Sequence, residues 1–171
     1  MNAKRLERLM ASHGANASAF GVVVRTLRGA FNIETSGQGI AHDMTVDEIA
    51  WYLAAYAGSE VAARADQTLT RLMGLQVATP NYPDTNWYGG NDFLTALQLI
   101  LRRQVSGVQS VGIARNFDCA TIRFSDGREI EYSTPEYRDT ISGISGAAFR
   151  SEGVLTGALL DHIAYIIGQE N

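Results

Sequence analysis

Apolar residues in the first 74 positions recur at intervals of three and four, which is the period of an amphipathic α-helix. This spacing predicts helices over residues 3–12, from Asn16 or Ser18 to about Ala30, from Thr45 to about Gly58, and from Ser59 to about Gly74. The third helix has the clearest start, because Thr45 and Glu48 have the spacing of a capping box. We therefore predict that the first part of the chain is helical.

Near Val108 the pattern changes to an alternation of apolar and polar residues, which is typical of β-strands. Three short strands are predicted, over residues 108–115, 119–124 and 128–133. They are close enough in sequence to form an antiparallel meander, so this part of the chain is predicted to be a three-stranded sheet.

The turns between these strands fix which residues face each other. A tight turn at Asn116-Phe117 sets Val111 opposite Ile122. A three-residue turn, Ser125-Asp126-Gly127, with Gly127 in the left-handed position, sets Ile122 opposite Ile130 and Arg123 opposite Glu129. One face of the sheet then collects apolar side chains and needs a cover.

Two helices are predicted to supply that cover, over residues 91–104, with Asn91 as the N-cap, and over 154–167. The Gly- and Ser-rich segment 134–152 is predicted to be irregular. Residues 78–90, ATPNYPDTNWYGG, contain two prolines and two adjacent glycines, which exclude a regular element. The predicted fold class is α+β, with a helical domain over 1–77, a linker over 78–90 and a small α+β domain over 91–171.

Composition narrows the class of protein. The chain is 46% hydrophobic and 19% charged, which is typical of a globular protein. No apolar run approaches the ~18 residues of a membrane span, and the N-terminal MNAKRLERLM lacks the apolar region of a signal peptide. Cys119 is the single cysteine, so an intramolecular disulfide is excluded. These features predict a cytoplasmic protein with no membrane contact.

Charge is distributed unevenly along the chain. The net charge is −4, yet residues 1–31 carry five basic residues against Glu7 alone. A basic end on an acidic body is expected where one face meets phosphate groups. The alternative interpretation is that these side chains lie on an ordinary solvated helix face.

Motifs of known enzymes are absent: the sequence has no GxxxxGK[ST], HExxH, GxSxG or CxxC pattern. Asp47 and Glu48 follow His42-Asp43, but carboxylates in the first turn of a helix are stabilised by its dipole without a metal. Cys119 is predicted in the middle of a strand, where a cysteine is usually inert packing. We predict no catalytic residue, no metal and no cofactor.

The stretch Val24-Arg25-Thr26-Leu27-Arg28, followed by a glycine-containing loop and the capped helix at Thr45, resembles winged-helix domains of the MerR and excisionase type. The resemblance covers residues 3–57. It implies that residues 24–28 lie near the end of a recognition helix, that the loop from Ser36 to Asp43 is the wing, and that the next helix follows it. This loop lacks the Arg or Lys usual in the family, which leaves Gln38 and His42 for uncharged contacts. The overall layout also resembles small uncharacterised phage and prophage proteins.

The sequence thus predicts a DNA-binding protein of the regulatory or packaging type, with a winged-helix-like front and a small α+β part that dimerises or binds an effector. The predicted DNA contacts are Lys4, Arg5, Arg8, Arg25, Thr26, Arg28 and Gln38. One alternative is a protein-binding inhibitor or assembly module that acts through an acidic surface and the aromatic loop around Tyr82, Trp87 and Tyr88. A second is a small enzyme of an unrecognised class.

Overall fold

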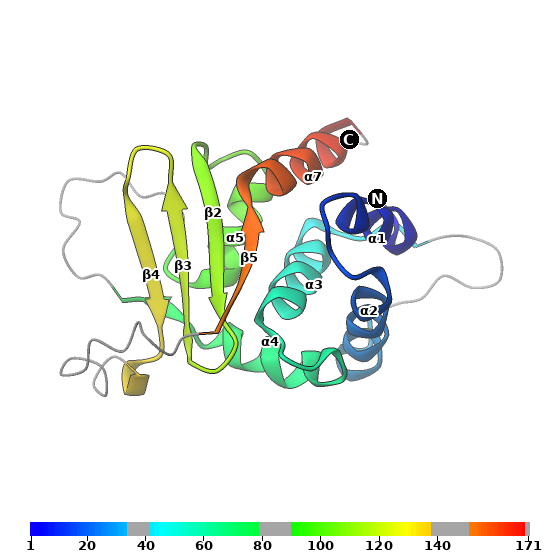
Figure 1. The fold of residues 1–171 in the computed structure, drawn as a ribbon, viewed down its shortest axis with the longest axis horizontal. Helices are drawn as coiled ribbons and strands as arrows, with labels where there is room; N and C mark the ends of the chain where they lie inside the picture. The colour runs from blue at the N-terminus through cyan, green and yellow to red at the C-terminus, as the bar shows by residue number, and fades with distance from the viewer. Residues whose placement is uncertain (34–41, 79–89, 138–150, 170–171) are drawn as a thin grey trace.

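A computed structural model describes residues 1–33, 42–78, 90–137 and 151–169. The first part is helical, as predicted: α1 (Ala3–Ser12), α2 (Ala17–Phe31), α3 (Val46–Gly58), the short 3-10 helix η1 (Ala62–Arg64) and α4 (Ala65–Met73) (Figure 1). In the described part of the chain, no helix is long and apolar enough to cross a membrane.

Side-chain caps define where the first helices begin. The Asn2 and Asn16 side chains accept hydrogen bonds from backbone N–H groups three residues later, which begins α1 and α2. The predicted capping box is confirmed: Glu48 N donates to Thr45 Oγ1 at 3.2 Å, and Thr45 N donates to Glu48 Oε2 at 2.6 Å. Both hydrogen bonds use donors that the helix itself leaves without a partner, so the start of α3 is firmly set.

Within the described residues the sheet has five antiparallel strands, which corrects the prediction of a three-stranded sheet. The strands, in the spatial order β1-β4-β3-β2-β5, are β1 (Gln76–Val77), β4 (Glu129–Ser133), β3 (Cys119–Phe124), β2 (Val108–Ala114) and β5 (Glu152–Thr156). The pairs predicted from the turns are present: Val111 faces Ile122, Ile122 faces Ile130 and Arg123 faces Glu129. Gly127 has a φ of 88°, as the three-residue turn requires.

The two additional strands come from segments whose apolar pattern does not indicate a strand. β1 is only two residues long and pairs with β4 at the end of the helical part. β5 pairs with β2 and begins inside the segment predicted to be irregular, so the last helix, α7 (Gly157–Gln169), starts three residues later than predicted. Similarly, α5 (Phe93–Leu101) is capped by Asp92 and not by Asn91.

Glycine allows β5 to lie in this position. A side chain at Gly153 would begin only 1.9 Å from the carbonyl oxygen of Ala57, at the end of α3. A side chain at Gly157 would begin 2.2 Å from the carbonyl oxygen of Val108 in β2. Both approaches are closer than any side chain permits, so these two glycines let the last strand and helix pack directly on the backbone of their neighbours.

One hydrophobic core joins the helical part to the sheet. Its members include Phe20 and Leu53 from the first part of the chain and Phe93, Ile122 and Leu159 from the second. Figure 1 shows α5 behind the sheet and α3 beside β5, with α1 and α2 farther from the strands. Residues on both sides of the predicted linker 78–90 therefore contribute to a single packed interior.

Candidate functional site

The outer face of α1 carries three of the predicted DNA-binding residues. Lys4, Arg5 and Arg8 all lie away from the core, whereas Leu6 and Leu9 on the opposite side of the same helix are buried in it. The spacing i, i+1 and i+4 places the three cations within one turn of each other on one helix face. We call this set, together with Arg25, the basic face.

Arg25 extends the basic face from α1 to α2. Its side chain is exposed. It lies beside Glu7 of α1, since atoms of both side chains border the space that a side chain at Gly21 would occupy. A Cβ at Gly21 would lie 3.7 Å from Glu7 Oε1 and 3.8 Å from Arg25 Nη1. The two helices therefore place four cations and one carboxylate on adjacent surfaces.

Arg28 does not share this exposed position. Its side chain is half-buried, and its guanidinium lies beside the buried ring of Tyr52 on α3. Burial raises the pKa of the Tyr52 hydroxyl, while the interaction with Arg28 opposes that rise. Arg28 therefore packs between α2 and α3, although the sequence suggested that it would point toward DNA beside Arg25.

The other residues predicted to contact DNA or a protein partner do not belong to the basic face. Thr26 is half-buried on α2. Gln38 in the loop matching the wing, and Tyr82, Trp87 and Tyr88 in the aromatic loop, lie outside the described residues.

Acidic residues close to the basic face in sequence have partners of their own. Asp43 lies 3.4 Å from the N-terminal amino group, and Asp47 pairs with Arg102 at 2.8 Å. Glu48 accepts hydrogen bonds from Thr45 and contacts His42 at 3.1 Å. Among the described residues, no acidic side chain forms an ion pair with Lys4 or Arg8, so these two charges face solvent.

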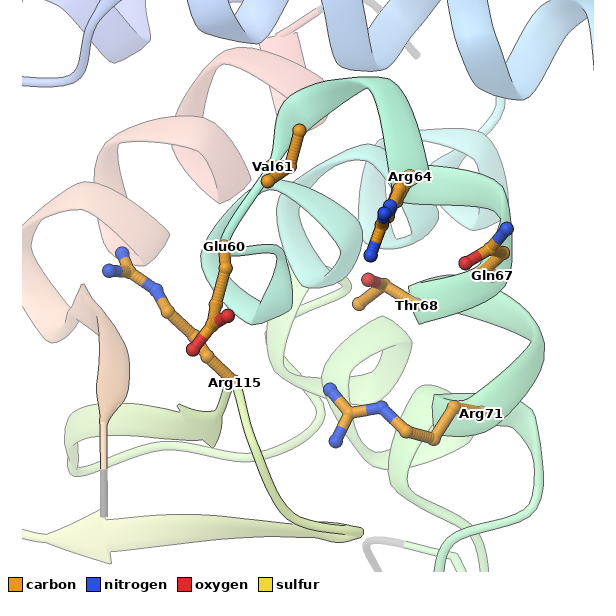
Figure 2. Close-up of a pocket in the computed structure, with 7 residues that line it drawn as sticks. All are labelled: Glu60, Val61, Arg64, Gln67, Thr68, Arg71 and Arg115. Carbon is orange, nitrogen blue, oxygen red and sulfur yellow. The ribbon is translucent and has the colours of Figure 1, made fainter. Parts of the chain in front are cut away.

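A second cationic feature, which we call the arginine pocket, lies at the start of α4. It has a volume of about 240 Å³ and is lined by Glu60, Val61, Arg64, Gln67, Thr68, Arg71 and Arg115 (Figure 2). Four of these residues, Arg64, Gln67, Thr68 and Arg71, follow the helical spacing i, i+3, i+4 and i+7 and so share one helix face. The sequence-based prediction missed this stripe, although its spacing is visible in the sequence.

The histidines and the cysteine lie in separate parts of the described structure. His13, at the end of α1, contacts His162 on α7, with 3.2 Å between Nε2 and Nδ1. Cys119 is buried in β3, and its thiol contacts the Tyr137 hydroxyl at 3.7 Å. Within the described ranges, no group of three or more His, Cys, Asp or Glu residues is placed to hold a metal ion.

Comparisons with known proteins do not place the chain in a family. No model of a protein family matches the chain, and no match is found among curated proteins or solved structures. The resemblance of residues 3–57 to MerR-type and excisionase-type domains stays a prediction, and the geometry of the basic face and the arginine pocket is the basis for any function.

Proposed function

We propose that the protein binds DNA through the basic face, with Lys4, Arg5 and Arg8 on α1 and Arg25 on α2 contacting backbone phosphates. The observation that carries this proposal is the cationic outer surface of α1 in a chain whose net charge is −4. A cluster of cations on one surface of an otherwise acidic protein creates a local positive potential, which suits a polyanionic partner.

The arrangement of α1 and α2 is suitable for this role. Val24 and Leu27 are buried against the rest of the helical part, while Arg25 lies on the opposite side of α2. A helix that reads a groove needs such a division between a packed side and a solvent side. The bridge between Asn2 and Asp43 also brings the end of the wing-matching segment next to the start of α1.

We infer the role within the cell from the resemblance of residues 3–57 to winged-helix domains of the MerR and excisionase type. A winged-helix-like front combined with an α+β part fits a regulatory or packaging protein of phage type, in which the second part dimerises or binds an effector. The net charge of the chain limits the DNA footprint, because an acidic body repels any duplex that extends beyond the basic face.

Titration of a labelled duplex by fluorescence anisotropy tests this function. Four phosphate contacts predict that log K falls against log salt with a slope of about −3 to −4. The variant Lys4→Gln/Arg5→Gln/Arg8→Gln should lose most of the affinity while it keeps its melting temperature, since exposed cations contribute little to stability.

The matched control changes two exposed arginines in the other half of the chain, Arg103→Gln and Arg128→Gln, and should bind as the parent protein does. Absence of binding at micromolar protein in low salt, or equal affinity of the triple variant and the parent, would contradict the proposal.

A further inference from the structure

The arginine pocket contains one arginine that is held in place by the protein. Arg71 donates from Nη2 to the carbonyl oxygens of Ala114, at 3.0 Å, and Gly58, at 3.4 Å, and from Nη1 to the carbonyl oxygen of Phe117. Asp118 is its acidic neighbour, 3.5 Å from Nη1. The backbone contacts fix the guanidinium without cancelling its charge, and Asp118, which is nearly half exposed, offsets only part of it.

A second arginine of the pocket has no partner within the described ranges. Arg64 is exposed, and its guanidinium forms no ion pair or hydrogen bond with any described residue. Figure 2 shows the guanidinium groups of Arg64 and Arg71 on either side of Thr68, while that of Arg115 points away from them. Arg115 donates instead to the carbonyl oxygen of Ala57, at 3.2 Å.

Thr68 places a hydroxyl group between the two charges. It is almost fully buried, and its oxygen accepts a hydrogen bond from Ser59 at 2.9 Å. A pair of hydroxyl groups uses only one of its two hydrogens, so with Ser59 as the donor the hydrogen of Thr68 is free for an acceptor in the pocket.

The backbone at this end of the helix adds to the positive potential. Neither η1 nor α4 begins with a side chain that caps its N–H groups. The N–H groups of Arg64 and Ala65 already bond to the carbonyl oxygens of Val61 and Ala62, so it is the positive end of the α4 dipole that favours a negative charge here. Glu60, on the opposite rim (Figure 2), supplies the only carboxylate among the residues that line the pocket.

We propose that the arginine pocket binds a phosphate monoester of a small hydroxylated molecule. The phosphate oxygens accept hydrogen bonds from Arg64, Gln67 and Thr68, and Arg71 acts as a fixed positive charge behind them. The carboxylate of Glu60 accepts a hydrogen bond from a hydroxyl group on the rest of the ligand. This site is separate from the basic face and does not depend on DNA binding there.

Isothermal titration calorimetry on the full chain tests the proposal with ribose 5-phosphate, inorganic phosphate and ribose as probes at constant ionic strength. Ribose 5-phosphate should bind more tightly than inorganic phosphate, and ribose should not bind. Arg64→Gln should weaken ribose 5-phosphate binding about tenfold or more, because one charged hydrogen bond is lost. Thr68→Val should also weaken it, whereas Thr68→Ser should restore it.

Two control variants show whether binding depends on the arginine pocket itself. Arg128→Gln, which removes an exposed arginine from the β3–β4 turn, should leave binding unchanged. The Lys4→Gln/Arg5→Gln/Arg8→Gln variant should also bind ribose 5-phosphate normally even though it fails to bind duplex DNA.

An oligonucleotide with a 5′-phosphate, compared with the same oligonucleotide ending in a 5′-hydroxyl, shows whether a nucleic-acid end is the source of the phosphate group.

In the Lys4→Gln/Arg5→Gln/Arg8→Gln variant, tighter binding of the 5′-phosphorylated oligonucleotide than of its 5′-hydroxyl form would assign the site to strand ends, and equal affinity for the two, with ribose 5-phosphate still bound, would assign it to a free metabolite. Failure of both phosphate monoesters to bind at millimolar concentration, or equal affinity in Arg64→Gln and the parent, would overturn the proposal.

Discussion

Arg25 and Arg28 are three positions apart on α2, yet their surroundings differ. Arg28 follows Leu27 directly and lies one turn after Val24, so it borders the buried stripe of the helix. Arg25 lies on the outer side and belongs to the basic face. Their angular positions on the helix are readable from the sequence, but the contact of Arg28 with Tyr52 depends on how α3 packs, which spacing alone does not give.

Replacement of the two arginines should therefore have different effects. Arg25→Ala should lower DNA affinity severalfold and leave the free energy of unfolding within about 0.5 kcal/mol of the parent, as for other exposed residues. Arg28→Ala should lower that free energy by about 1–3 kcal/mol, because it removes a half-buried group that contacts Tyr52. Urea denaturation and DNA titration of both variants check this, and equal stability losses would show that Arg28 is not packed as described.

Tyr52 predicts how stability changes in alkaline solution. Its pKa is raised above the ordinary value of 10.0, chiefly by burial, so the folded chain keeps a proton that the unfolded chain releases. The free energy of unfolding should therefore fall as the pH rises above 10.0. Tyr52→Phe should flatten that part of the profile, as measured by urea denaturation at a series of pH values; parallel profiles for the two proteins would contradict it.

At the scale of elements, local signals predict some features well and others poorly. The capping box at Thr45 and the turn at Gly127 depend on residues a few positions apart, and both are present as predicted. β5 has no such signal: Val154 and Leu155 adjoin the apolar pattern of α7, and the strand exists because it pairs with β2, about 40 residues earlier. The arginine pocket likewise joins α4 to Arg115 at the end of β2, so only its helical stripe could be found from spacing.

The contact between β5 and α3 can be tested through glycine. Gly153→Ala should lower the free energy of unfolding by about 1–3 kcal/mol, since the new methyl group would overlap the Ala57 carbonyl oxygen. Gly168 in α7 is the matched control, because a side chain there meets nothing within 4 Å. Gly168→Ala should leave stability unchanged or raise it by up to about 1 kcal/mol through helix propensity. Similar losses in both variants would argue against the close approach of β5 to α3.

At the scale of the whole molecule, the helical part and the sheet share one interior. α3 lies between its neighbouring helices and β5, and β1, from the helical part, is an edge strand of the sheet. The sequence predicted where most helices and strands lie but not this union, because the division at 78–90 was inferred from local composition. Burial that joins distant segments is not visible in local composition.

A shared interior predicts one cooperative unfolding transition. Differential scanning calorimetry should give a single peak whose calorimetric and van't Hoff enthalpies agree. Leu53→Ala in α3 and Ile122→Ala in β3, both fully buried, should shift that peak to lower temperature without splitting it. Two separate peaks, with each substitution moving only one of them, would show that the parts unfold independently.

The strand order also has a consequence for synthesis on the ribosome. β2, β3 and β4 leave the ribosome in succession and can pair at once, but β2 then has a free edge until β5 follows, and β5 is the last of the described strands to be made. An unpaired edge next to an uncovered apolar face attracts other chains. The nascent chain is therefore most prone to aggregate in the interval between the release of β4 and the arrival of β5, and a chaperone that shields β2 would act in that interval.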